Sequence, residues 1–103
     1  MRVIERLEDL IEEEIHDVKK YAKLAAEFKK ENPALAQVLY NISVQEEGHQ
    51  AALHAEVVKM IEAYKREHGA PPEAMIAVYD HVHKKHIDKM AEARRYQELY
   101  KNG

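Results

Sequence analysis

Glu14, Glu46 and His49 are residues with metal-ligating side chains that lie on otherwise apolar helical seams of this chain. Glu46 and His49 are three residues apart, so a helix places both side chains on one face, one turn from each other. Carboxylates and imidazoles are suitable ligands for divalent transition metals. Because the chain has no cysteine, a metal site must use these two kinds of side chain. The pattern therefore predicts a carboxylate and histidine metal centre.

Two breaks in the sequence delimit the elements that must position these residues. The breaks are Asn32-Pro33 and the segment from Gly69 to Pro72, where glycine and proline suit helix ends and helix starts. They predict three long helices at about 2–30, 33–68 and 73–101, with Asn32 as the N-cap of the second. Charged residues make up 34% of the 103 residues, and glycine and proline number only three each. We therefore expect an all-α fold, with residues 1–103 forming one domain.

Each expected helix carries a seam of side chains spaced alternately three and four residues apart, which is typical of a face turned toward a bundle core. The first two seams are apolar apart from the candidate ligands and Glu56, and the third is less regular. The predicted seams are Ile4, Leu7, Ile11, Glu14, Val18, Tyr21, Ala25 and Phe28 in the first helix; Leu35, Leu39, Ile42, Glu46, His49, Leu53, Glu56 and Met60 in the second; and Ile76, Tyr79, His83, His86, Met90, Ala93, Gln97 and Tyr100 in the third.

The heights of the candidate ligands follow from the hairpin that the first two helices should form. If the chain turns near residue 31 or 32, positions whose numbers sum to about 63 lie level. Glu14 then lies level with His49 and within one turn of Glu46. An unpaired buried carboxylate costs several kcal/mol, so these groups need a partner such as a cation. Asp17, one turn after Glu14, is either a further ligand or an acceptor for an imidazole N–H.

The alternative is that these residues are ordinary solvated charges on helix surfaces, since Glu and His are frequent in this chain. The pair Glu46 and His49 alone would not distinguish the two interpretations. Its position on an apolar seam, level with a carboxylate of the preceding helix, favours the metal centre.

The spacing of these residues resembles that of the ferritin-like superfamily, particularly rubrerythrins. Glu14 precedes Tyr21 by seven residues, and Glu46-x-x-His49 begins thirty-two residues after Glu14. The resemblance implies that Glu14 and Glu46 are iron carboxylates, with Glu46 bridging, and that His49 is the nitrogen ligand. It further implies a site for two iron ions, with manganese or zinc as other candidate metals. The implied activity is that of a ferroxidase or a peroxide-reducing or dioxygen-reducing di-iron enzyme.

The chain departs from the ferritin-like pattern because it has no fourth helix to supply a second Glu and a second Glu-x-x-His. One possibility is that a second copy supplies the same ligands across a two-fold axis, as the resemblance to short encapsulated ferritins implies. The other is that the third helix supplies them from Asp80, His83, His86 or Glu92. Glu92 has the expected height but lies off the apolar face, whereas His83 and His86 face inward about ten residues away from that height. The predicted metal-site residues are Glu14, Asp17, Glu46, His49 and His83.

Charge and hydropathy restrict the expected partners and location. The 19 acidic and 16 basic residues are interleaved, so no basic stripe is available for nucleic acid. The N-terminal segment lacks the apolar region of a signal peptide, and no stretch approaches the ~20 apolar residues of a membrane span. We expect a cytoplasmic homodimer or larger homo-oligomer whose partners are metal ions and dioxygen or peroxide. The alternative is a non-catalytic helical interaction module or metal carrier.

Overall fold

Three helices and no strand make up residues 2–103, the part of the chain described by the computed structural model. They are α1 (Arg2–Phe28), α2 (Pro33–His68) and α3 (Glu73–Asn102). The all-helical prediction is confirmed, although α1 ends two residues earlier and α3 one residue later than expected. None of these helices combines the length and apolar character needed to span a membrane.

The two turns are built from the residues that predicted them. Asn32 is the N-cap of α2, as expected: its side-chain oxygen accepts a hydrogen bond from the Leu35 N–H at 3.1 Å, and Pro33 follows at the first helical position. Gly69 ends α2 with a φ of 78°, a conformation that glycine adopts without steric cost. Its N–H donates to the carbonyl of Lys65. Both helix boundaries are therefore fixed by local chemistry.

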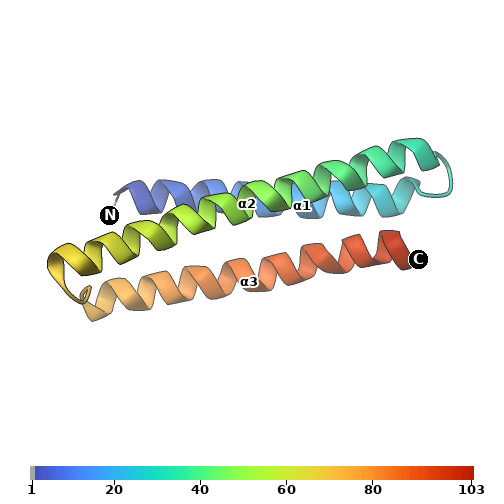
Figure 1. Cartoon of the computed structure of the whole chain (residues 1–103). Helices are drawn as coiled ribbons and strands as arrows, with labels where there is room; N and C mark the ends of the chain where they lie inside the picture. The colour runs from blue at the N-terminus through green and yellow to red at the C-terminus, as the bar shows by residue number, and fades with distance from the viewer. Residues whose placement is uncertain (1) are drawn as a thin grey trace.

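The helices form an elongated antiparallel bundle of 56 × 18 × 18 Å, in which α1 is the common partner (Figure 1). α1 packs along both α2 and α3, whereas α2 and α3 approach each other closely at few points. The turn between α2 and α3 lies at the same end of the bundle as the N-terminus. The central core cluster contains residues from all three helices: Ile11, Ile15, Val18, Val57, Met90 and Ala93.

The predicted seams match the buried faces of α3 and, in part, of α1, but not that of α2: the buried residues of α3 are His86, Met90, Ala93 and Gln97, all on the predicted seam. On α1, Ile11, Val18 and Ala25 of the seam are buried, and so are Ile15 and Ala22 beside it, because this helix faces two neighbours. On α2 the prediction was wrong: the buried residues are Ala36, Ser43 and Val57, each one position beyond a predicted seam residue. The predicted seam of α2, including its candidate ligands, therefore lies at the edge of the core.

Hydrogen bonds and an ion pair between polar side chains connect α2 and α3. Gln97 Nε2 donates to Ser43 Oγ at 3.3 Å and to Glu47 Oε1 at 3.2 Å, and Arg94 pairs with the other oxygen of the Glu47 carboxylate. Ser43 and Gln97 are both buried. Because buried polar groups need hydrogen-bond partners, these contacts fix the relative height of the two helices.

The histidines of α2 and α3 include one stacked pair and one buried ring. The rings of His54 and His83 stack with centroids 4.8 Å apart. His86 is only 5% exposed, and its Nε2 has no hydrogen-bond partner among the described residues. Burial lowers the pKa of His86, opposed by the Glu12 carboxylate. Burial also lowers the pKa of His54, with a further contribution from His83. Both His86 and His54 thus favour the neutral form in the folded protein.

We expect the protein to lose stability as the pH falls below about 6.5, the ordinary histidine pKa in the unfolded chain. A lowered folded-state pKa means that the unfolded state binds protons first, so the free energy of unfolding decreases from that pH down to the folded-state pKa. The variant His86→Met should be more stable by about 1 kcal/mol at pH 7, because it removes a buried unpaired nitrogen. It should also lose less stability between pH 7 and pH 5, as measured by urea unfolding. His81→Met, exposed on the same helix, is the matched control and should show neither effect.

Candidate metal centre

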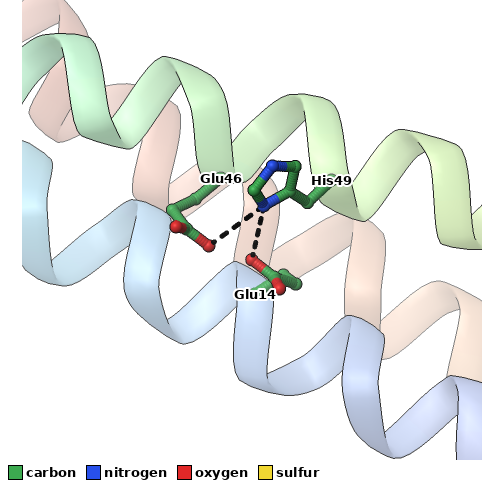
Figure 2. A group of neighbouring side chains, drawn as sticks. All are labelled: Glu14, Glu46 and His49. Carbon is green, nitrogen blue, oxygen red and sulfur yellow. Dashed lines mark ion pairs between the residues drawn. The ribbon is translucent and has the colours of Figure 1, made fainter.

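Glu14 of α1 and Glu46 and His49 of α2 converge on one point, as Figure 2 shows. The Nδ1 atom of His49 lies 3.6 Å from Oε2 of Glu14 and 3.7 Å from Oε2 of Glu46. Each residue offers one ligand atom, and these three atoms all lie within 4.8 Å of one another. The expectation that the three residues share one height is therefore confirmed.

The spacing of the three atoms fits a metal ion. Metal–ligand bonds to histidine nitrogen and carboxylate oxygen are about 2.0–2.2 Å long, which puts neighbouring ligand atoms about 3 to 3.5 Å apart. The two separations from His49 Nδ1, 3.6 and 3.7 Å, exceed this range by only a few tenths of an ångström, and the two carboxylate oxygens lie within 4.8 Å of each other. Small rotations of the side chains would close that difference. The donor set, two carboxylates and one imidazole, suits zinc, manganese or iron.

The group is open to solvent on one side. The side chains of Glu14 and Glu46 are 25% and 20% exposed, whereas that of His49 is 62% exposed. Behind the group in Figure 2 runs α3, so the three side chains lie on the face of the α1 and α2 pair that α3 does not cover. A metal held there would have three protein ligands and further coordination positions accessible from outside the chain.

The electrostatics of the group favour a positive charge. Oε2 of Glu14 is buried and has no hydrogen-bond partner among the described residues. The pKa of Glu14 is raised, chiefly by hydrogen bonding with the Glu46 carboxyl, and further by burial and by the charges of Glu46 and Asp17; His49 acts in the opposite direction. The two neighbouring carboxylates place negative charge at one point, which disfavours the ionised form of Glu14. A divalent ion would balance that negative charge.

The other predicted ligands lie elsewhere. Asp17 is not a member of the converging group, and its carboxylate pairs with Lys20 at 3.5 Å. His83 is sandwiched between the rings of His54 and Tyr79 in the α2 and α3 contact. Glu92 forms an ion pair with Lys19 of α1 at 2.8 Å. Within residues 2–103, therefore, α3 adds no ligand to the group formed by Glu14, Glu46 and His49.

Sequence reasoning assigned no role to His54, which the structure places against His83. The signal was available, because the height rule for the second hairpin places residues 54 and 83 within about one turn of each other. His16, His68 and His81 are exposed.

Comparison with known proteins yields no family model, no curated protein and no solved structure that matches this chain. The resemblance to ferritin-like proteins thus depends on the residues and their geometry alone.

We expect Glu14→Gln to stabilise the metal-free protein near neutral pH by about 1 kcal/mol or less, or a few degrees in melting temperature. The pKa of Glu14 is raised in the folded protein, so the folded state holds this proton more tightly than the unfolded chain does. The resulting stabilisation is complete below the ordinary glutamate pKa and is lost as the pH rises through the folded-state value. The neutral amide removes that loss. Thermal unfolding at pH 5 and pH 7.5 measures it, with the exposed Glu13→Gln as the control. A variant less stable than wild type at both pH values would contradict the expectation.

Proposed function

We propose that this protein binds a divalent transition metal, with iron as the physiological ion, through Glu14, Glu46 and His49. The observation that carries the proposal is the convergence of three ligand atoms from two helices within 4.8 Å. Oε2 of Glu14, one of these converging atoms, is buried and has no hydrogen-bond partner among the described residues, which a bound cation would supply.

We further propose that these three residues are half of a two-metal site, which a second copy of the chain completes across a two-fold axis. Support comes from the exposed flank around the ligands. On α1, Leu10, Tyr21 and Phe28 lie four, seven and fourteen residues from Glu14 and so share its face. None of the three is buried, and Leu10 is 45% exposed.

The same flank continues on α2. Ile42 and Met60 lie four and fourteen residues from Glu46, and neither of them is buried. Leu35 and Val38, on the same side of the helix, are 40% and 53% exposed. Apolar side chains of α1 and α2 therefore surround the ligands on a face that α3 leaves uncovered, and such surfaces mark interfaces. Pairing this face with its copy would build a four-helix bundle from two α1 and two α2 helices.

In this assembly the residues of each chain have distinct tasks. Glu14 and Glu46 provide negative charge, which favours the oxidised state of a bound metal. His49, which lies one helical turn after Glu46, provides the nitrogen ligand. The apolar flank would exclude bulk water from the closed interface. Two Fe(II) ions, as substrate, would each give one electron and become Fe(III); with two protons from solvent, the two electrons would reduce hydrogen peroxide to two waters or dioxygen to hydrogen peroxide, which is the oxidoreductase activity that we propose.

We expect Mn(II), and Fe(II) under anaerobic conditions, to raise the melting temperature of the wild-type protein. A metal at 100 times its dissociation constant stabilises the folded state by about 2.7 kcal/mol. Glu46→Ala should abolish the shift because it removes one of three ligands. Glu56→Ala is the matched control, since Glu56 is an exposed carboxylate on the same helix that pairs only with Lys59 among the described residues. An equal metal-induced shift in wild type and Glu46→Ala would exclude the site.

The half-site proposal makes a separate prediction. Wild-type protein should sediment as a dimer or a larger even-numbered oligomer and should bind about one metal ion per chain. Leu10→Lys places charge in the proposed interface, so it should dissociate the assembly and weaken metal binding although all three ligands remain. It should also slow oxygen or peroxide consumption with Fe(II). Ile87→Lys, a change at an exposed residue of α3, should alter none of these properties. A monomer that binds metal with wild-type affinity would refute the shared site.

A further inference from the structure

A second feature of the molecule is an apolar groove at the end of the bundle that contains the turn between α2 and α3. Its volume is about 460 Å³, within the range of binding sites in proteins. Side chains from all three helices form its walls, among them Ile4, Ile61, Tyr64, Met75, Val78 and Tyr79. On α1 the groove involves residues 4–8, at least six residues or about 9 Å along the helix from Glu14. It is therefore separate from the candidate metal centre.

The apolar surface of the groove extends onto the outer face of α3. Val78 is 63% exposed, and Met75 and Ile76 are 39% and 41% exposed. The three residues lie within one turn at the start of the helix. Leaving such side chains in water forgoes stabilisation of about 25 cal/mol for each Å² that burial would cover. A contiguous patch of this kind, extending beyond a cavity, fits a protein surface better than a small molecule.

The charges around the groove are mainly negative. Glu5, Glu8 and Asp80 line it, and Lys65 is the one cation among the lining residues. No ion pair links these four residues to one another or to any other residue in the described part of the chain, 2–103. Burial, followed by the charges of Asp9 and Glu5, raises the pKa of Glu8.

The negative charges also act on Tyr79, one of the residues that line the groove. The pKa of the Tyr79 hydroxyl is raised by burial and then by the charges of Glu8 and Asp80. A half-buried carboxylate without a partner is costly, and a cation brought by a ligand would remove that cost. The groove thus combines apolar walls with carboxylates that lack a partner.

We propose that this groove docks a cationic amphipathic segment of a partner protein, whose apolar side chains contact Met75, Val78 and Tyr79 and whose Lys or Arg residues pair with Glu8 and Asp80. Anionic partners, such as nucleic acid or an acidic membrane surface, would meet like charge at this position. The proposal is independent of metal binding, because the two sites share no residue.

Selection of binders from a displayed library of random 16-residue peptides against the wild-type protein tests this proposal. We expect the enriched peptides to combine apolar residues at helical spacing with Lys or Arg, and to bind more weakly as the salt concentration rises. Failure to enrich any binder, or enrichment of neutral or acidic peptides, would overturn the proposal.

Variants then locate the binding of an enriched peptide, measured by fluorescence anisotropy. Val78→Ser and Met75→Ser should each weaken binding about tenfold, and Glu8→Gln severalfold with a shallower salt dependence. The matched controls are Ile87→Ser on α3 and Glu13→Gln on α1, exposed residues outside the groove. Both should change the affinity less than twofold. Equal losses in the groove variants and their controls would refute the assignment. Self-association of the wild type that Val78→Ser abolishes would instead identify a second copy as the occupant.

Discussion

The packing of α1 against two helices at once is the constraint on which the rest of the structure depends. α1 buries Ile11, Ile15, Val18, Ala22 and Ala25, a stripe wide enough to face both neighbours. α2 and α3 must then share this surface instead of packing closely on each other. As a result, the core lies toward the side of α3, and the opposite flank of α1 and α2 keeps its apolar residues half-exposed. The converging carboxylates and imidazole lie on that flank.

This position explains how the chain tolerates two neighbouring carboxylates. At the centre of a three-helix core, Glu14 and Glu46 would lose all contact with water, at a cost comparable with the whole stability of a small domain. At the edge, the side chains of Glu14 and Glu46 remain 25% and 20% exposed, and His49 opposes the rise in the pKa of Glu14 that burial and Glu46 cause. The arrangement is stable enough to fold and still favours a cation. Functional sites commonly sacrifice some folding stability in this way for the ability to bind a ligand.

Sequence patterns predicted the helices and the height of the candidate site well because both depend on local chemistry. Asn32, Pro33 and Gly69 fix the turns, and fixed turns determine which residues of an antiparallel hairpin lie level. The rotation of α2 was not predictable in this way. Periodicity identifies an apolar stripe but not which neighbour covers it, so Ala36, Ser43 and Val57 were missed. The pairing of His54 with His83 depends on the same rotation.

The polar residues of α3 show why this helix cannot complete the site within one chain. Glu92 is paired with Lys19, His83 is stacked between His54 and Tyr79, and Gln97 bonds to Ser43 and Glu47. Each of these contacts fixes α3 against α1 or α2 on the side away from Glu14. To bring a ligand to the metal centre, α3 would have to cross to the other face of the pair, and the core cluster with Met90 and Ala93 would be lost. α3 therefore contributes no ligand to the group formed by Glu14, Glu46 and His49 in this arrangement of the described residues.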